Sequence, residues 1–466
     1  MLHLLLALLC FFARPDERVT WTGSVELPGA LKLDFSVELG KDSGTISIPM
    51  QGAKDLPLDD VSVSDKELKF SIKQSGAFWE LKVADDGKSA TGVLKQGGAE
   101  LKTTMKRLAA GETAAKELKR PQEPKPPFPY ESVEVTFENK AANATLAGTL
   151  TLPKGSGPFP CVVLVTGSGP QDRDEALLGH RPFLVLSDYL TRHGLAVLRY
   201  DDRGVAKSTG KFATATSDDF ADDALAGLEF LKTRKEIDAK KIGIAGHSEG
   251  GLIAPMCAAK SKDVAFIVLL AGTGIRGAEL LPIQSKLIAV ASGTPEAERQ
   301  AKESSAIFAM MVAGKSDSEV KEAIRVAVLK QLALEPETKD LPEAERKKKA
   351  DQLVEEQSGE LFSSWFRRFL VLDPRESLKK VTCPVLAVNG EKDLQVPSLV
   401  NLPQIEKTLR DSGNKDVMII EFAGLNHLFQ TCKTGSPTEY PQIEETFAPV
   451  ALEGVTDWIR KHTGLE

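Results

Sequence analysis

Residues 242–251 read Ile-Gly-Ile-Ala-Gly-His-Ser-Glu-Gly-Gly, and this stretch indicates the fold of the chain. Its apolar start predicts a buried strand, and the residues after it, 252–259, have the composition of a helix. A sharp turn from strand to helix forces the residue at its tip into a cramped backbone conformation, so small residues such as Gly246 and Gly250 must flank it. The stretch therefore predicts a nucleophile elbow, with Ser248 placed to attack a carbonyl carbon near a helix N-terminus.

Apolar runs with the length of buried strands alternate with helical stretches on both sides of this turn. We expect a helix at 221–232 and strands at 145–152, 161–165, 196–200, 265–270, 384–388 and 417–420. Near-continuous apolar strands separated by helices are typical of a mainly parallel sheet that is covered on both faces. The sequence therefore predicts a doubly wound α/β core formed by residues 131–274 and 371–466.

Residues 275–370 interrupt this pattern. Strand signals stop, and charged helical stretches such as 295–312 and 343–357 take their place. An all-helical insertion between two strands of a sheet is expected to lie over the strand ends as a cap. The charged run at 345–349 is expected on a solvated helix face.

The N-terminal part of the chain has a different periodicity. Between residues 14 and 108, short runs such as 45–48 and 68–72 alternate apolar and polar residues and are separated by Gly-containing turns. This period of two predicts a small antiparallel β domain, as a sheet or a barrel. Residues 109–130 lose the pattern and are rich in proline, which predicts an extended linker.

The first thirteen residues, MLHLLLALLCFFA, form a short apolar run. The run is too short to span a bilayer and is typical of the apolar part of a secretory signal. We expect export to the periplasm or the extracellular space, without stable insertion into a membrane. The alternative is a cytoplasmic protein in which residues 1–13 form a buried N-terminal segment.

Composition limits the classes of partner. The chain has 466 residues, too many for one hydrophobic core, and a net charge of −7. That charge, and the lack of a Lys/Arg stripe with interleaved aromatic residues, argues against nucleic acid as a partner. The five cysteines have neither zinc-binding nor disulfide-framework spacing. We expect no metal and no cofactor.

A serine hydroxyl becomes a good nucleophile when a base takes its proton and an acid orients that base. His427 lies in the loop directly after the expected strand at 417–420. Elimination favours it as the base over the other five histidines, which lie in the leader, before the nucleophile, in the elbow or in the C-terminal helix: His3, His180, His193, His247 and His462.

The acid is expected in the loop after the preceding strand, and Asp393 lies at the tip of the loop after 384–388. Glu391 is the local rival, and Asp373 is a distant one for which a helix-capping role is more natural. The order Ser, Asp, His along the chain is the one expected for this architecture.

The oxyanion of a tetrahedral intermediate needs two hydrogen-bond donors. We expect the backbone N–H of Glu249, the residue after the nucleophile, and a second donor from the loop Thr-Gly-Ser-Gly-Pro at 166–170. Ser168 is the first choice for the second donor and Gly169 the alternative. A glycine-rich turn without a ligand is the competing interpretation of this loop.

Two further stretches are dense in charge: Gln-Asp-Arg-Asp at 171–174 and Asp-Asp-Arg-Gly at 201–204. We expect ion pairs that brace the loops. A phosphate site is not expected, because the first strand is not followed by a P-loop pattern.

Five ordered motifs together resemble the α/β-hydrolase superfamily and, more narrowly, bacterial carboxylesterases of the EstD type. They are GSGPQDRDE at 167–175, DDRG at 201–204, GHSEGG at 246–251, GEKDLQVP at 390–397 and LNHLFQ at 425–430. The resemblance extends from residue 131 to the end, and residues 18–108 resemble β-rich modules that precede such hydrolases. It implies hydrolysis of short-chain carboxylic esters by Ser248, Asp393 and His427. One departure is Ala206, where the family commonly has glycine, and we expect a local change in that loop.

The leading hypothesis is therefore a metal-independent serine carboxylesterase that acts on a small-molecule ester through an acyl-enzyme. An aminopeptidase or other amide hydrolase, and an acyl-CoA thioesterase or acyltransferase, would use the same residues. A hypothesis of a different kind is that the protein is not an enzyme but a non-catalytic envelope protein whose β domain binds a ligand. The intact Ser/Asp/His set argues against this last reading.

Overall fold

The structure is a computed structural model that describes residues 18–26, 32–48, 53–96, 99–109, 119–294, 296–335 and 338–465. The chain divides into two compact units, with the boundary between Leu118 and Lys119. The expected leader at 1–13 lies outside the described residues. In the described part of the chain, no helix has the length and apolar character that a bilayer crossing requires.

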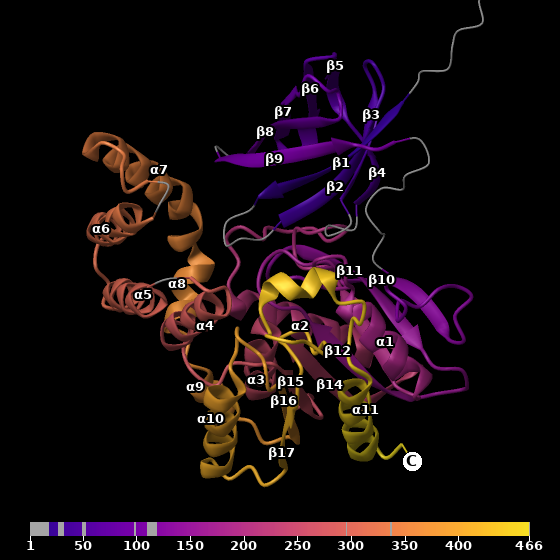
Figure 1. Cartoon of the computed structure of the whole chain (residues 1–466). Coiled ribbons are helices and arrows are strands. Elements are labelled where there is room, and N and C mark those ends of the chain that lie inside the picture. Colours follow the sequence, from indigo (N-terminus) through magenta and orange to yellow (C-terminus); the bar gives the residue numbers. More distant parts are fainter. Residues whose placement is uncertain are drawn as a thin grey trace, which may run out of the picture. The chain divides into compact units, whose positions relative to one another are not determined.

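The first unit is a nine-stranded antiparallel sheet with the strand order β4-β3-β2-β1-β9-β8-β7-β6-β5 (Figure 1). Burial alternates along its strands, which is why one face forms a core that contains Phe35 and the stacked rings of Phe70 and Trp79. The expected antiparallel β-rich region is thus confirmed. The strands are β1 (Val19–Glu26), β2 (Lys32–Leu39), β3 (Gly44–Ile48), β4 (Ala53–Pro57), β5 (Asp59–Val63), β6 (Glu67–Ile72), β7 (Ala77–Val83), β8 (Ser89–Gln96) and β9 (Ala99–Arg107), with a 3-10 turn at Lys73–Ser75.

The second unit contains an eight-stranded sheet with the order β10-β11-β13-β12-β14-β15-β16-β17. From β13 to β17 all neighbouring strands are parallel, and β10 and β11 add an antiparallel edge. The expected mainly parallel α/β fold is confirmed. The strands are β10 (Glu131–Asn139), β11 (Ala144–Leu152), β12 (Phe159–Val165), β13 (Ala196–Tyr200), β14 (Ile237–His247), β15 (Ile267–Leu270), β16 (Val385–Gly390) and β17 (Val417–Phe422).

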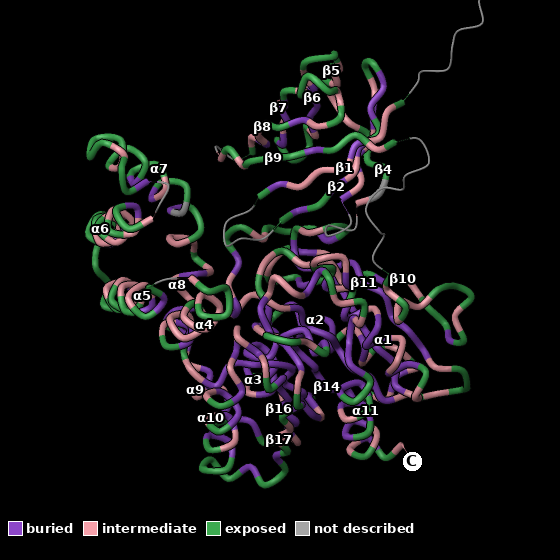
Figure 2. The backbone as a smooth tube through the Cα atoms, in the orientation of Figure 1, coloured by how far each residue is buried: buried purple, intermediate pink, exposed green. Residues whose placement is uncertain are grey.

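Helices cover both faces of this sheet, because successive residues of each central strand point to opposite sides. Val162 of β12 belongs to a core cluster with residues of α1 and α11, whereas Val163 clusters with residues of α2, α3 and α10. The central strands are therefore buried along their length (Figure 2). These helices are α1 (Pro182–Arg192), α2 (Ser217–Lys232), α3 (Glu249–Lys260), α10 (Ser398–Asp411) and α11 (Pro449–Thr463), and a 3-10 helix spans Pro437–Gln442.

A helical segment joins β15 to β16, although these two strands are hydrogen-bonded neighbours in the sheet. Most of its helices share a small apolar core of their own, which includes Met311, Ile324 and Phe366. Helix α8 is tied to α2 by Arg368, whose Nε donates to Asp218 Oδ2 at 2.5 Å. The charged run at 345–349 is largely exposed, as expected. The helices are α4 (Gly277–Ala291), α5 (Ala297–Val312), α6 (Asp317–Leu334), α7 (Glu343–Leu361), α8 (Ser364–Val371) and α9 (Pro374–Leu378).

Candidate active site

Ser248 lies at the sharp turn between β14, which ends at His247, and α3, which begins at Glu249. Its backbone has φ 54° and ψ −112°, a conformation that is strained for a residue with a side chain and that is typical of functional turns. A Cβ atom added to Gly246 would lie 2.0 Å from the carbonyl oxygen of Gly250, so no larger residue fits there. The Ser248 side chain is only partly buried and remains accessible to a ligand.

His427 and Asp393 are buried and directly bonded. His427 Nδ1 lies 2.8 Å from Asp393 Oδ2. The other carboxylate oxygen, Oδ1, accepts the backbone N–H groups of Gln395 at 2.8 Å and Val396 at 2.9 Å. Because an ionised carboxylate only accepts hydrogen bonds, Nδ1 of His427 is the donor in this contact.

The two rival acids have other partners. Glu391 is exposed, and its Oε2 accepts the backbone N–H of Gly424 at 2.7 Å. Asp373 is the N-cap of α9 and also pairs with Arg276 and Arg375. The structure therefore brings Asp393, and neither rival, to His427.

One cavity of about 240 Å³ brings the expected site residues together. Its described lining includes Ser248, His427, Ser168 and Glu249, and does not include Gly169. Asp393 lies behind His427, outside the lining. Four apolar side chains of the helical segment complete the wall: Leu280, Leu281, Trp365 and Phe369.

The loop at 166–170, where the second oxyanion donor is expected and which is called the oxyanion loop below, is held by the carboxyl groups of Glu175 and Asp202. The N–H of Gly167 donates to Glu175 Oε1 at 2.7 Å, so this group is already engaged. Asp202 accepts the Thr166 hydroxyl and the Gln171 N–H, both at 3.0 Å. Burial raises the pKa of Asp202 to about 8, against the opposing effect of these hydrogen bonds.

Only the backbone N–H of Glu249 was expected at the site, but its side chain also makes close contacts there. It is 2% exposed and accepts the Ser217 hydroxyl at 2.6 Å. Trp365 of α8 donates its indole N–H to both oxygens, at 2.8 and 3.0 Å. Burial raises the pKa of the Glu249 carboxyl, while these hydrogen bonds lower it. The residue after Ser248 is thus tied to the helical segment across the cavity.

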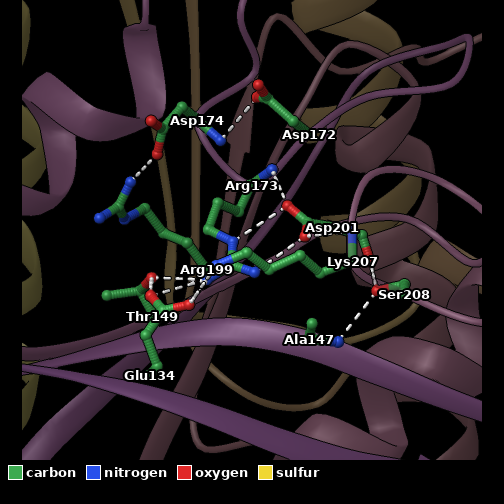
Figure 3. A network of polar contacts seen from close by, with 10 residues as sticks. All are labelled: Glu134, Ala147, Thr149, Asp172, Arg173, Asp174, Arg199, Asp201, Lys207 and Ser208. Atoms are coloured by element: carbon green, nitrogen blue, oxygen red, sulfur yellow. Dashed lines mark hydrogen bonds and ion pairs between the residues drawn. The ribbon is translucent and has the colours of Figure 1, made fainter.

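The charged stretches around the loop form the expected ion pairs (Figure 3). Arg173 donates to both oxygens of Asp201, at 3.0 and 2.8 Å, and also reaches Glu134 of β10. Asp174 pairs with the buried Arg199 of β13. These contacts join residues 173 and 174 to β10, to β13 and to the start of the loop after β13.

His247 is a further buried residue of this region. The sequence placed it in the elbow and gave it no role. Its Nδ1 lies 2.9 Å from Glu175 Oε1, and its Nε2 lies 3.0 Å from the carbonyl oxygen of His427. Glu175 lies within the GSGPQDRDE motif, which is the signal that could have pointed to this pair.

Within the described ranges, no cluster of three or more His, Cys, Asp or Glu side chains is arranged to hold a metal ion. The cysteines of the described ranges, Cys161, Cys257, Cys383 and Cys432, are free thiols.

Comparison with known proteins places these features in context. Residues 182–431 match the model of a family described as Hydrolase_4, serine aminopeptidase, S33. Esterase EstD of Thermotoga maritima is 30% identical over 308 residues, which are 66% of this chain and 63% of that protein. The chain therefore spans slightly less than two thirds of that relative.

Two solved structures are also similar. An esterase of Pyrococcus furiosus, Pf2001, has a TM-score of 0.41 and 17% identity, and the match covers 72% of this chain and 91% of that one. The α/β hydrolase GrgF from Penicillium sp. sh18 has a TM-score of 0.43 and 16% identity, and the match covers 72% of this chain and all of that one. Ser248, Asp393 and His427 lie within the segment that matches the family model.

Proposed function

Because the chain belongs to the serine aminopeptidase (S33) family of α/β hydrolases, we propose that it is a serine carboxylesterase that hydrolyses small, uncharged esters. The observation that carries the proposal is the shared cavity: Ser248, on a strained turn, and His427, bonded to Asp393, line the same space. A nucleophile, a base and an orienting acid are the parts that acyl transfer requires.

In the proposed mechanism, Nε2 of His427 takes the hydroxyl proton of Ser248 as the serine oxygen attacks the ester carbonyl carbon. The imidazolium that forms is stabilised by Asp393 and then gives its proton to the departing alkoxide. Water, activated by the same histidine, attacks the acyl-enzyme, releases the acid and regenerates the Ser248 hydroxyl.

The oxyanion of each tetrahedral intermediate would be bound by the backbone N–H groups of Glu249 and Ser168. Support for Glu249 comes from its position as the first residue of α3, where the helix dipole adds positive potential. Support for Ser168 over Gly169 comes from the cavity lining, which includes only the former.

The size and charge of the cavity favour a small neutral ester. A volume of about 240 Å³ is below the roughly 300–1,000 Å³ of pockets for drug-sized ligands. Among the described lining residues are two carboxylates, and both are engaged: Glu175 Oε1 accepts from a backbone N–H and a histidine, and Glu249 accepts from a serine and a tryptophan. The second oxygen of Glu175, Oε2, is buried and therefore not exposed to a ligand. The aminopeptidase alternative would need a carboxylate available for the substrate ammonium.

The same lining bears on acyl-CoA substrates. Its described members include no Lys or Arg that would pair with the phosphates of coenzyme A. The ester hydrolase is therefore the alternative that the site supports best, ahead of a thioesterase or acyltransferase.

We further propose the division expected from the sequence: a β-rich domain at 14–108, a linker at 109–130, a catalytic domain at 131–274 and 371–466, and a cap at 275–370. The boundary of the two compact units within the linker, and the position of α4–α8 between two strands, support it. For residues 1–13 we propose an export signal. N-terminal sequencing of protein recovered from the periplasm would test this.

The proposed function is tested with a panel of short and long p-nitrophenyl esters, aminoacyl amides and acyl-CoA thioesters. We expect turnover of the short esters, and a fluorophosphonate probe should label the wild type at Ser248. Ser248→Ala should remain folded and lose both hydrolysis and labelling. A folded Ser248→Ala variant that keeps its activity would refute the mechanism, and a wild type that neither labels nor turns over any substrate would favour the non-catalytic alternative.

A further inference from the structure

We propose that Glu175 and His247 form a buried ion pair that holds the oxyanion loop in place against Ser248 and His427. The two residues would be positioning residues of the esterase, because neither needs to touch the reacting atoms. The inference rests on the proposed function and adds two residues to its machinery.

Glu175 connects the oxyanion loop to the elbow through a single oxygen. Its side chain is 3% exposed, and Oε1 accepts both the Gly167 N–H at 2.7 Å and the His247 Nδ1–H at 2.9 Å. The backbone of Glu175 has φ 53°, a left-handed conformation that is unfavourable for a residue other than glycine. Such strain persists where surrounding contacts enforce it, and it clusters at functional sites.

The hydrogen bonds of His247 define its charge. A carbonyl oxygen only accepts, so Nε2 must carry a proton to bond the carbonyl oxygen of His427 at 3.0 Å. A carboxylate also only accepts, so Nδ1 carries a proton as well, and the ring is an imidazolium. Burial alone would lower the pKa of His247, but the charge and hydrogen bond of Glu175, together with the His427 carbonyl and the charge of Asp393, raise the pKa above its ordinary value.

The ion pair therefore joins three segments whose relative positions decide catalysis. Gly167 precedes Ser168, the proposed oxyanion donor; His247 precedes the nucleophile; and His427 is the proposed base. The fit is close, because a Cβ atom added to Gly167 would lie 3.2 Å from Glu175 Oε1 and 3.3 Å from the Ser248 Cβ. Displacement of Glu175 would move the Ser168 N–H relative to the serine oxygen.

Glutamine keeps the shape of Glu175 but not its charge. Its amide oxygen can take the place of Oε1, and its NH₂ group then occupies the position of Oε2, a buried atom that has no hydrogen-bond partner in the described structure, so two N–H donors are buried without an acceptor. Without the carboxylate charge, His247 loses the main contribution that keeps it protonated. Glu175→Gln thus removes the charge of the ion pair while changing the side-chain volume very little. A neutral His247 has one ring proton and can donate to only one of its two partners, so the coupling is broken.

The test measures kcat and KM separately on a short p-nitrophenyl ester. We expect Glu175→Gln to lower kcat by about 100-fold, as a displaced or lost oxyanion donor does, with KM within about threefold of wild type. His247→Gln should give a similar loss. The double variant should be no slower than the slower single variant, because the two residues act as a unit.

Asp174→Asn is the matched control. Asp174 is adjacent in sequence and also forms an ion pair, with Arg199, but it does not belong to the described cavity lining. It should change the melting temperature without changing kcat by more than about threefold. If Glu175 had a purely structural role, Glu175→Gln would likewise change the melting temperature and leave kcat within about threefold of wild type.

A folded Glu175→Gln variant with a kcat within about threefold of wild type would overturn the inference, as would multiplicative losses in the double variant. If Glu175→Gln does not fold, Glu175→Asp and His247→Gln are tested in its place. An unchanged kcat in either folded variant would also overturn the inference. Failure of the proposed function itself is distinguishable, because the wild type would then neither hydrolyse the ester nor label at Ser248.

Discussion

Replacing the buried Asp393 by asparagine should reverse the protonation of His427. Asp393 Oδ1 accepts two backbone N–H groups, so the amide oxygen of an asparagine must take that position. The amide NH₂ then faces His427 Nδ1 in place of Oδ2, next to the side-chain NH₂ of Asn389, which donates to Oδ2 at 3.2 Å. Two donors cannot face each other, so Nδ1 must become the acceptor and the ring proton moves to Nε2.

A proton on Nε2 disables the base, because this nitrogen must receive the proton of Ser248. An Asp-to-Asn change that imposes the wrong tautomer in a catalytic triad lowers kcat by about 10⁴-fold, or about 5.5 kcal/mol of transition-state stabilisation. We expect a loss of this order for Asp393→Asn, with KM changed little, since the carboxylate lies outside the cavity lining.

The assay is steady-state hydrolysis of a short p-nitrophenyl ester, with a melting curve to show that the variant is folded. Glu391→Gln is the matched control, because Glu391 is two residues away, exposed, and bonded to the Gly424 N–H instead of to histidine. It should stay within about threefold of wild type. If Asp393→Asn is folded and retains kcat within tenfold, or if Glu391→Gln is the slower variant, the assignment of the acid is wrong.

Three further outcomes are expected. Trp365→Ala removes an aromatic side chain from the cavity wall, so the acyl chain that the enzyme prefers among p-nitrophenyl esters should become longer. An unchanged preference in the folded variant would contradict the role of Trp365 as a wall of the acyl site. Burial raises the pKa of Asp202 from 3.8 to about 8. Between these two pH values the folded protein therefore holds a proton on Asp202 that the unfolded chain has lost. The contribution of Asp202 to the free energy of unfolding thus falls as the pH rises through this range. The Asp202→Asn variant does not titrate at this position. Urea unfolding should therefore show its free energy of unfolding, relative to wild type, increasing from about pH 5 to about pH 8. A difference between the two proteins that stays constant over this range would argue against the raised pKa of Asp202. Ala206→Gly should raise the melting temperature, because Ala206 has φ 45° and glycine relieves a cost of about 1 kcal/mol; a lower melting temperature would refute this.

The central sheet was predictable because its strands are buried on both faces and therefore consist of continuous apolar runs. Strand β13 coincides with the expected 196–200. Strand β10 was not expected, because it lies at the edge of the sheet, where exposed glutamates alternate with buried residues. Strand β14 begins at Ile237, earlier than the apolar run indicates, since the residues between Ile237 and that run, 238–241, are mostly polar and are exposed or partly exposed.

The candidate site residues were predictable where a residue lies directly after a strand that the sequence itself indicates. Ser248, Asp393 and His427 each follow a recognisable strand, so the topology alone brings them to one edge of the sheet. The contact between Trp365 and Glu249 joins residues separated by more than a hundred positions, and nothing in the amphipathic pattern of α8 distinguishes a cavity wall from a core position. The partners of buried polar groups such as His247 depend on such distant contacts.

The helical segment leaves the sheet after β15 and returns at β16, and these strands are paired in register from Ile267 with Val385 to Leu270 with Val388. Both ends of the segment are therefore anchored at neighbouring positions that do not depend on what lies between them. The helices between these ends supply Leu280, Leu281, Trp365 and Phe369 to the cavity wall. A change confined to them would therefore reshape the space in which the proposed ester binds, while the strand order that positions Ser248, Asp393 and His427 stays the same.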